Sequence, residues 1–324
     1  MSTAIYGYDA KGQKIDETVI YGSGQDSVSG TLRYAYQANG LKSKLTYPGG
    51  AEQISIYDKN RLASVNIKGN LIQYQDYVWG VSTKTTMPGA IRTTTYDPLQ
   101  RPIEIAGISN GGAVLMDYSY AYDANGNITR KSTEDGDFIY QYDKLDRLIS
   151  ATPPVGLQQG PGNVDGLPVE QYTYDADHNR TTSAHQPGVW IYNEDNQLLG
   201  YGSGTNQQTF DYDRNGNAIA QKIGSPQSPA ATRKYVYNAS ERMVEVRDND
   251  ATTAKYQYDP RGRRIKKETP AGVTWFLYAD EGLIAEFTGA GLLKRTYGWK
   301  MGGAWGTDPE VSPQISHGQS KLFE

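Results

Sequence analysis

The chain has 324 residues, 37% hydrophobic content, no cysteine and a formal net charge of −4 at pH 7. The lack of cysteine excludes disulfides and thiolate metal sites. The small, mixed charge gives no general attraction to nucleic acid or anionic membranes, and no run of about 20 apolar residues predicts membrane insertion. The 26 tyrosines, against 5 phenylalanines, indicate β-sheets with one packed face and one wettable face.

One short motif recurs along the chain from its beginning to its end. The motif is Tyr-x-Tyr-Asp, and in several copies a glycine stands three residues after the aspartate. Degenerate copies, such as those at Tyr36, Tyr192 and Tyr237, fall between the clear ones. We assign a structural role to the motif positions of the clear copies, which in chain order are Tyr8, Asp9, Gly12, Tyr96, Asp97, Tyr122, Asp123, Gly126, Tyr142, Asp143, Tyr174, Asp175, Tyr212, Asp213, Gly216, Tyr258, Asp259 and Gly262.

Residues 120–129 show why the motif predicts a β-hairpin. Tyr120 and Tyr122 are two residues apart, so on a strand they point to the same face. Asp123 suits the first position of a type I turn, where its carboxylate can accept a hydrogen bond from the backbone two residues on. Gly126 stands where such a hairpin needs a residue with positive φ. Each unit is therefore expected to be strand, turn, strand.

The spacing of the units predicts an array. Tyr122 and Tyr142 are 20 residues apart, as are Tyr258 and Tyr278, and a period of this kind marks a repeat architecture. Thirteen units would give about 26 strands and one sheet roughly 125 Å wide, whereas open twisted sheets rarely exceed about 10 strands. We predict an all-β fold of about a dozen hairpins in a coiled, curled antiparallel sheet, forming part or whole of a hollow β-shell.

A β-propeller is the main alternative architecture. Two units make about 40 residues, the size of a four-stranded blade. No signature marks every second unit, however, so one continuous wall of hairpins is preferred. Two stretches rich in Pro and Gly, residues 153–168 and 224–229, are predicted to be loops between units.

The motif Tyr-x-Tyr-Asp-x-x-Gly-(Asn/Arg) resembles the YD repeat of Rhs, teneurin and Tc-toxin BC-type proteins, and the resemblance covers nearly the whole chain. Residues 297–309 also resemble the stretch where bacterial Rhs repeats approach their core-associated domain. The resemblance implies a hollow β-cage that encloses a toxin in a bacterial polymorphic toxin system. Because residues 1–9 lack the pattern of a signal peptide, it also implies cytoplasmic synthesis and a specialised secretion route to the outside or the cell surface.

The C-terminal residues depart from this family pattern. Family members cleave themselves with aspartates in a later Asp-Pro-x-Gly motif, whereas here Asp308 and Pro309 are followed by Glu310. The residues after Gly298 are also too few for a toxin domain. We therefore expect a YD-repeat shell domain over residues 1–298, a tail or plug over 299–324, and neither self-cleavage nor toxicity.

The expected function is a non-enzymatic shell or scaffold that encloses or presents a polypeptide guest such as a toxin. The expected partners are that guest or a second cage segment. Homo-oligomers are also expected, because the strands at open sheet edges have unpaired backbone groups. No cofactor, metal, nucleic acid or membrane insertion is expected.

Parts of the sequence also suit two other functions. Exposed Tyr and Trp side chains would suit an extracellular adhesion or carbohydrate-binding module, although core packing is expected for most of the tryptophans. A serine hydrolase is less favoured: Ser109 lies in a Gly-x-Ser-x-Gly sequence, but that motif must join a strand to a helix, and the following residues are typical of a strand. His178 and His185 lack a third metal ligand at suitable spacing. The candidate carbohydrate platforms are Trp79, Trp190, Trp275, Trp299 and Trp305.

Overall fold

The computed structural model describes residues 2–161, 163–299 and 309–311. Within these ranges the secondary structure consists of β-strands and two short 3-10 helices, η1 (Val155–Leu157) and η2 (Gly204–Asn206). This confirms the all-β prediction. The described part of the chain contains no helix long and apolar enough to cross a membrane.

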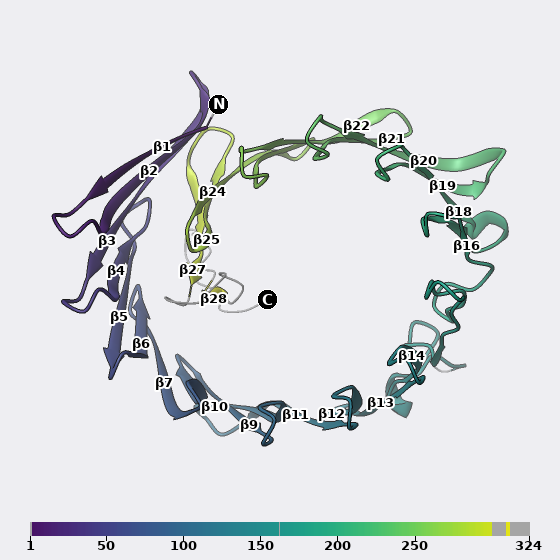
Figure 1. The fold of residues 1–324 in the computed structure, drawn as a ribbon, viewed down its shortest axis with the longest axis horizontal. Helices are drawn as coiled ribbons and strands as arrows, with labels where there is room; N and C mark the ends of the chain where they lie inside the picture. Colours follow the sequence, from purple (N-terminus) through teal and green to yellow (C-terminus); the bar gives the residue numbers. More distant parts are fainter. Residues whose placement is uncertain (1, 162, 300–308, 312–324) are drawn as a thin grey trace. The chain divides into compact units, whose positions relative to one another are not determined.

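The first large sheet has 15 strands, and each strand is hydrogen-bonded to its neighbours in the sequence (Figure 1). Its strands are β1 (Ser2–Tyr8), β2 (Lys14–Ser23), β3 (Asp26–Tyr36), β4 (Lys42–Thr46), β5 (Glu52–Asp58), β6 (Arg61–Ile67), β7 (Asn70–Val78), β8 (Val81–Met87), β9 (Ala90–Tyr96), β10 (Pro102–Ser109), β11 (Val114–Tyr122), β12 (Ile128–Thr133), β13 (Gly136–Tyr142), β14 (Leu148–Thr152) and β15 (Glu170–Gln171).

The second large sheet has 11 strands in sequence order, and a two-stranded sheet follows it. The strands of the second sheet are β16 (Ile191–Tyr192), β17 (Leu198–Tyr201), β18 (Gln208–Tyr212), β19 (Ala218–Ser225), β20 (Ser228–Tyr237), β21 (Met243–Asp248), β22 (Ala251–Tyr258), β23 (Arg264–Thr269), β24 (Gly272–Ala279), β25 (Gly282–Thr288) and β26 (Leu293–Thr296), and the small sheet pairs β27 (Gly298–Trp299) with β28 (Pro309–Val311).

A one-residue bulge marks the end of the repeat strands. The antiparallel register between β11 and β12 shifts between Ala121 and Tyr122, and the β13–β14 register shifts between Gln141 and Tyr142. A type I turn followed by a residue in the left-handed region produces this kind of bulge in a hairpin. The repeated motif therefore specifies the turn and the strand register together.

Two sequence-based alternatives are wrong. Sheets of 15 and 11 consecutive strands are not the four-stranded blades of a propeller. The loop predicted at residues 224–229 is instead a tight hairpin, in which β19 reaches Ser225 and β20 begins at Ser228. Gly224 has a φ of +102° at a register shift, so the Gly- and Pro-rich composition forms a bulge within the strands.

The expected single sheet is interrupted between β15 and β16. Here the side chain of Glu170 takes backbone amides that would otherwise be available for strand pairing: its carboxylate accepts from the amide of Ala184 at 2.7 Å and from that of His185 at 2.9 Å. An isolated bridge between Tyr174 and Arg180 is what remains of regular pairing in the following unit. These two amides are thus bonded to a side chain rather than to a neighbouring strand.

The chain divides into two compact units. Unit 1 comprises Met1–Ser82, Val236–Val246 and Thr252–Glu324, and unit 2 comprises Thr83–Tyr235 and Arg247–Ala251. Unit 1 therefore contains both ends of the sequence, whereas unit 2 contains most of its middle.

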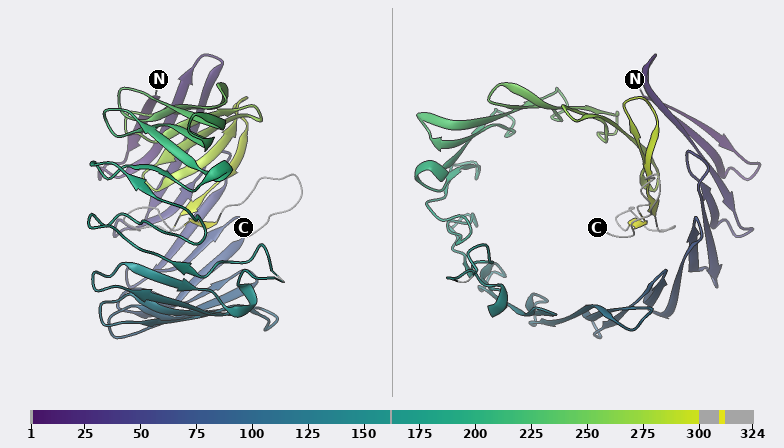
Figure 2. Two further views of the ribbon diagram at one scale, coloured as in Figure 1. Left: turned by 90° about the vertical axis from the view of Figure 1, so that its right-hand side faces the viewer. Right: turned by 180° about the vertical axis from the view of Figure 1, so that it is seen from behind.

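In unit 1, strands from the two ends of the sequence pack face to face. The β24–β25 hairpin lies against the N-terminal strands (Figures 1 and 2). Burial of this much apolar surface is the main source of stability for such a pairing of sheets. The shared core consists of Val19, Tyr21, Val28, Leu32, Tyr34, Leu45 and Tyr47 from the N-terminal strands, with Ile265, Trp275, Leu277, Ala279, Ile284, Ala285 and Phe287 from the C-terminal ones.

Ion pairs surround this core. Lys14 binds Asp280 at 2.6 Å, Lys42 binds Glu281, and Lys266 binds Asp26 at 2.8 Å. Each pair joins an N-terminal strand or turn to a C-terminal one. Within unit 1 the two ends of the sequence are thus held together by apolar packing and by charge.

Candidate functional site: the repeat turn

The turn at Asp123 shows the geometry of a complete unit. The backbone amide of Asp123 donates to the carbonyl oxygen of Asn127 at 3.0 Å, and the amide of Gly126 donates to that of Asp123 at 3.2 Å. One carboxylate oxygen, Oδ1, accepts from the amides of Asn125 and Asn127, both at 2.9 Å. Gly126 has a φ of +93°. The aspartate therefore closes the turn by bonding to its backbone.

The same bonding pattern recurs in the other turns. In each of them one side-chain oxygen accepts from the amides two and four residues further on, at 2.8–3.1 Å. Asparagine uses its amide oxygen in the same way as aspartate uses its carboxylate. The residues that act so are Asp9, Asp97, Asp143, Asp175, Asn193, Asp213, Asn238 and Asp259.

The position three residues after the aspartate always has positive φ in these turns, whether or not it is glycine. The glycines are Gly12, Gly126, Gly216 and Gly262, with φ between +76° and +93°. Other side chains cost energy in this region. They occupy it here at Gln100, Asp146, His178, Asn196 and Glu241, with φ between +59° and +67°.

The residue four positions after the aspartate binds its second carboxylate oxygen. Where that residue is arginine, its Nε donates at 2.7 Å, as in the pairs of Asp97 with Arg101, Asp143 with Arg147 and Asp259 with Arg263. Where it is asparagine, its side-chain amide donates at 3.0–3.1 Å, as in the pairs of Asp123 with Asn127, Asp175 with Asn179 and Asp213 with Asn217.

These arginines also reach the next turn of the array. The guanidinium of Arg101 lies 4.5 Å from the ring centroid of Tyr122, and its Nη1 donates to the carbonyl oxygen of Asp123 at 3.3 Å. Arg147 lies 4.7 Å from the ring of Tyr174 in the same way. A cation over an aromatic face is attracted to it electrostatically. One arginine therefore connects two consecutive turns.

The second tyrosine of a unit completes the connection. Its hydroxyl donates to the backbone carbonyl of the residue five positions after the preceding turn's aspartate or its equivalent, at 2.6–2.9 Å. Tyr96, which follows a turn without aspartate, and Tyr278 donate no such bond to a described residue. The donor and acceptor pairs are Tyr36 and Lys14, Tyr57 and Lys42, Tyr122 and Pro102, Tyr142 and Ile128, Tyr174 and Leu148, Tyr192 and Arg180, Tyr212 and Leu198, and Tyr258 and Met243.

Sequence reasoning placed the tyrosines on one face but missed this ladder of hydroxyl-to-carbonyl bonds. The acceptor is a backbone oxygen, so residues as different as Pro102, Arg180 and Leu198 can supply it. The available signal was the constant spacing of the units, together with the preference for Tyr over Phe at this position.

Hydrogen bonds within the turns lower the pKa values of two turn aspartates. The side-chain amide of Asn127 lowers the pKa of Asp123, burial opposes this, and the backbone amides of Asn127 and Asn125 lower it further. The side-chain and backbone amides of Asn217 likewise lower the pKa of Asp213. A general acid needs a raised pKa near the working pH. These two carboxylates have the opposite shift, and their oxygens are engaged by the turn.

Ser109 has the role of a turn aspartate. Its Oγ accepts from the amide of Ala113 at 3.0 Å, and its own amide donates to the carbonyl of Ala113 at 2.8 Å. The residue ends β10 and the chain continues into β11, whereas a nucleophile elbow leads into a helix. The structural context of a hydrolase serine is therefore missing at this position.

The two described histidines have different structural roles. His178 is the positive-φ residue of its turn, and its Nδ1 is 3.3 Å from Nη1 of Arg147. His185 donates its backbone amide to Glu170. Over residues 2–161, 163–299 and 309–311, no group of three His, Cys, Asp or Glu side chains is arranged to hold a metal ion.

The tryptophans differ in exposure. Trp275 is fully buried in the core, and Nε1 of Trp299 donates to the carbonyl of Leu283 at 2.7 Å. Trp190 stacks on Tyr201 with a centroid distance of 4.9 Å and lies under Arg180. Trp79, 60% exposed, has the most open ring of those described. Trp305 lies outside the described residues.

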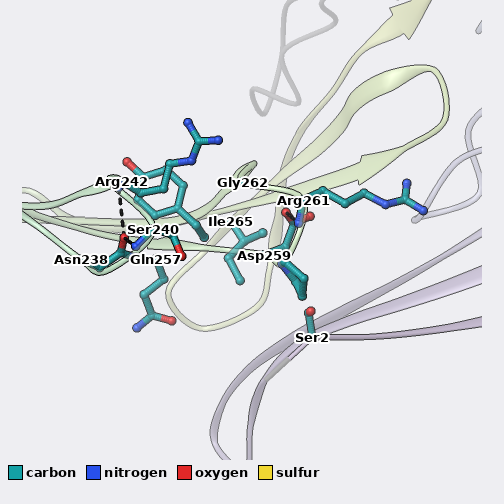
Figure 3. Close-up of a pocket in the computed structure, with 11 residues that line it drawn as sticks. Ser2, Asn238, Ser240, Arg242, Gln257, Asp259, Arg261, Gly262 and Ile265 are labelled. Carbon is teal, nitrogen blue, oxygen red and sulfur yellow. Dashed lines mark hydrogen bonds between the residues drawn. The ribbon is translucent and has the colours of Figure 1, made fainter. Parts of the chain in front are cut away.

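A pocket of about 470 Å³ lies in unit 1 between the start of β1 and the turn after β22. Ser2, Asp259, Arg242 and Arg261 are among the residues that line it. Figure 3 shows the side chain of Arg261 extending away from that of Arg242. The basic residues around this pocket do not converge on one point, so the pocket is not arranged as an anion site.

Comparison with known families agrees with this geometry. Residues 162–288 match the family profile described as Teneurin YD-shell, and residues 122–158 match the RHS Repeat profile. The chain is a YD-repeat protein. The YD-shell match supports a structural shell role for the wall of hairpins, and it confirms the family predicted from the motif.

Two curated relatives of this YD-repeat chain are named as nucleases. It is 27% identical over 262 residues to the tRNA3(Ser)-specific nuclease WapA of Bacillus spizizenii and, over the same length, to the tRNA nuclease WapA of Bacillus subtilis. These matches cover 78% of the chain but 10% of each relative. The chain thus spans about a tenth of the length of these two proteins.

A solved structure shares the fold. The crystal structure of TcdB2-TccC3 without its hypervariable C-terminal region matches 90% of this YD-repeat chain and 20% of its own chain, with a TM-score of 0.50 and 16% identity. At this identity the likeness concerns the fold alone. The predicted boundary between a shell domain and a tail after residue 298 stays a prediction, because most of residues 299–324 lie outside the described residues.

Proposed function

We propose that this YD-repeat chain is a non-enzymatic structural shell that encloses or presents a polypeptide guest such as a toxin. The observation that carries the proposal is the use of the repeated polar groups. The carboxylates of the turn aspartates, the arginines and the tyrosine hydroxyls bond to their own turn or to the next one. This chemistry builds a wall and leaves the motif residues no evident reactive role.

The packing of unit 1 supports enclosure. Because strands from both ends of the sequence share one core, residues 83–235 leave unit 1 and return to it. The middle repeats therefore form a long segment of chain whose two ends are both anchored in unit 1 by non-covalent packing. Such an arrangement suits a container better than an extended binding surface.

The comparisons support a toxin context. The curated relatives are named as tRNA nucleases, and the chain spans a small part of them. The solved neighbour is named as a complex whose hypervariable C-terminal region was removed. We propose that the repeats contribute the shell in such a protein, that the active polypeptide is the guest, and that the assembly is exported by a specialised secretion route.

Protection of a guest from proteolysis tests the proposal. A natively disordered polypeptide with a terminal epitope would be fused after Glu324, and its digestion would be compared with that of the same polypeptide alone. Enclosure predicts a digestion rate well below that of the free polypeptide, because cleavage requires a state in which the protease can reach the chain. A matched fusion carrying Leu277→Asp, which breaks the shared core, should lose the protection.

Two results would contradict the proposal. In one, the guest is digested at the free rate while the repeats themselves stay intact. In the other, small-angle scattering of the chain shows a compact, filled particle with no room for a guest. A carbohydrate-binding role would instead require glycan binding that is lost in Trp79→Ala.

A further inference from the structure

Lysines from two N-terminal strands hold the two-residue turn between β24 and β25. Nζ of Lys14, at the start of β2, binds Asp280 at 2.6 Å, and Nζ of Lys42, at the start of β4, binds Glu281. The partners are 266 and 239 residues apart in the sequence. We call these four residues the latch, and we call the packing of the β24–β25 hairpin against β2–β4 the seam.

Strand β3, which lies between β2 and β4, contributes Tyr34 to the latch. The ring of Tyr34 lies under both lysines, with Nζ of Lys14 at 5.0 Å and Nζ of Lys42 at 4.7 Å from its centroid. Its hydroxyl donates to Glu17 at 3.2 Å, and the nearly buried carboxylate of Glu17 also binds Lys14 at 2.6 Å. Because Tyr34 belongs to the shared core, the latch borders that core directly.

A second charge contact lies at the other end of β3. Both carboxylate oxygens of Asp26, the first residue of β3, accept from Nζ of Lys266 at 2.8 Å. The side chain of Lys266 is nearly buried, and its Nζ lies 4.7 Å from the ring centroid of Trp275 in β24. Ion pairs therefore hold the seam near both ends of β3.

The closed seam has a cost that separation of the hairpin would remove. Oε2 of Glu281 and Nε1 of Trp275 are buried without a hydrogen-bond partner among the described residues, and such atoms lose free energy that water would restore. Separation would also hydrate the nearly buried charges of Lys14, Glu17 and Lys266, which are costly to remove from water. Apolar packing and buried polar groups thus oppose each other, as a contact with two states requires.

Near neutral pH, salt is the expected control of this balance. Burial opposes the charge of Lys14, but its hydrogen bonds to Asp280 and Glu17 raise its pKa. Burial likewise opposes the charge of Asp280, but Lys14 lowers its pKa, so this pair stays charged at neutral pH. The side chains of Asp280 and Asp26 are 61% and 65% exposed. Dissolved ions can therefore reach and screen both carboxylates.

We propose that the seam is the place where this YD-repeat shell opens, and that the charges of the latch control the opening. In the closed state, the latch and the pair of Lys266 with Asp26 hold the hairpin on β2–β4. In the open state, the β24–β25 hairpin leaves β2–β4 with its own strand pairing intact, and salt favours this state. The inference rests on the proposed shell function and adds to it the position and the control of guest release.

A single introduced thiol can report the opening, because the chain has no cysteine. Ala285→Cys places the thiol in β25 at a fully buried position of the shared core, so its reaction with the neutral reagent iodoacetamide requires the seam to open. Ala220→Cys is the matched control, because Ala220 is a buried alanine in β19 of unit 2. Each rate is divided by that of the same thiol in the urea-unfolded chain at the same salt concentration.

A salt series gives the first result. Between 0.1 M and 1 M sodium chloride, the screening length falls from about 10 Å to about 3 Å. Because weaker ion pairs favour the open state, we expect the normalised labelling rate of Ala285→Cys to rise at least about threefold over this range. The rate of Ala220→Cys should stay constant.

Variants of the latch, made in the Ala285→Cys background, give the second result. Lys42→Met leaves the carboxylate of Glu281 buried and unpaired, and it should raise labelling more than about tenfold. Glu281→Leu should also raise labelling, because Lys42 then lacks its partner. The double variant removes both charges and joins two apolar side chains, so its labelling should return to the parent rate or below, with a smaller salt dependence.

Three results would overturn the inference. One is labelling of Ala285→Cys that changes neither with salt nor with Lys42→Met. Another is an equal rise for Ala285→Cys and Ala220→Cys, which would mean that the seam opens only when the whole chain unfolds. The third is a double variant that labels as fast as the two single variants, since the seam would then not depend on the pairing of these charges.

The guest-protection assay separates this inference from the shell function. Protection in 0.1 M sodium chloride tests enclosure, and its loss in 1 M sodium chloride tests the seam, with the free polypeptide digested at the same salt as the reference. We expect the parent fusion to lose protection in 1 M salt and the fusion carrying Lys42→Met and Glu281→Leu to keep it. Equal protection of the parent fusion in both salts refutes this inference alone, whereas no protection in either salt refutes the shell function.

Discussion

The hydroxyl of Tyr122 donates to the carbonyl oxygen of Pro102 at 2.7 Å, across the boundary between two consecutive repeats. The same bond recurs in other units between Tyr36 and Tyr258, to the residue five positions after the preceding turn's aspartate or its equivalent. Tyr77 donates instead to Leu62, four positions after Asp58. Adjacent hairpins are therefore joined by a side chain as well as by the strand ladder. This explains why tyrosine is so much commoner than phenylalanine, because the ring alone would serve packing equally well.

Removing this hydroxyl should destabilise the fold. Tyr122→Phe keeps the ring under Arg101 but leaves the carbonyl of Pro102 without its donor, at a cost of about 0.5–1.5 kcal/mol. Urea unfolding followed by tyrosine fluorescence and circular dichroism would measure the change. Tyr8→Phe is the matched control and should leave the stability unchanged, because the Tyr8 hydroxyl donates to no described residue.

The turn aspartates should make the stability depend on pH. The pKa of Asp123 in the folded chain lies below its ordinary value of 3.8, because the side-chain amide of Asn127 and backbone amides bond to the carboxylate against the opposing effect of burial. The unfolded chain therefore takes up the proton first as the pH falls. The stabilisation is present above pH 3.8 and is lost as the pH falls from there through the lower folded value.

Asparagine tests this explanation. Asp123→Asn keeps an oxygen that can accept from the amides of Asn125 and Asn127, as Asn193 and Asn238 do in their own turns. The variant should fold with the same turn but lose its share of the acid dependence, measured as the denaturation midpoint between pH 2 and 6. An unchanged pH profile in Asp123→Asn would show that other carboxylates cause the acid dependence.

At the positive-φ position of the turn, replacing glycine should lower the stability, and introducing glycine should raise it. Gly126 has a φ of +93° and the nearest atom to a Cβ added there would be 3.9 Å away, so Gly126→Ala has room but is strained, at a cost of about 1–2 kcal/mol. Gln100 already bears that strain at a φ of +64°. Gln100→Gly should therefore raise the stability by up to about 1 kcal/mol. Thermal unfolding of both variants checks the pair, and a loss of stability in both would contradict the explanation.

The sequence was sufficient to predict those features that depend on residues close together in the chain. The turn at Asp123 and Gly126 follows from residue types and spacing, and the antiparallel array follows from its repetition. The hairpin at 224–229 was missed because Gly and Pro mark a bulge and a loop alike. The turn role of Ser109 was missed because serine replaces the aspartate that defines the motif.

The packing of the N-terminal strands against the C-terminal strands could not be predicted from the sequence, for a different reason. Leu32 and Leu277 share one core, but every repeat presents a similar alternation of apolar and polar residues. Nothing in the pattern of a single unit says which distant unit will cover it. The buried partners of a repeat are determined by the curvature of the intervening strands, and this depends on small twists added over many residues.

The shared core of unit 1 gives the last prediction. Leu277 is fully buried in β24, and Leu277→Ala should cost about 2–5 kcal/mol through lost burial and the cavity left behind. Its distinctive effect is at the other end of the sequence, where the amides of β2 and β3 should exchange faster because Val19, Val28 and Leu32 pack in the same core. Hydrogen exchange with mass spectrometry measures this directly.

Leu99→Ala, at a side chain that is 71% exposed, is the matched control and should change stability by less than about 0.5 kcal/mol. If Leu277→Ala increases exchange in β23–β25 alone and leaves β2 and β3 unchanged, the two ends of the sequence do not share a core in solution.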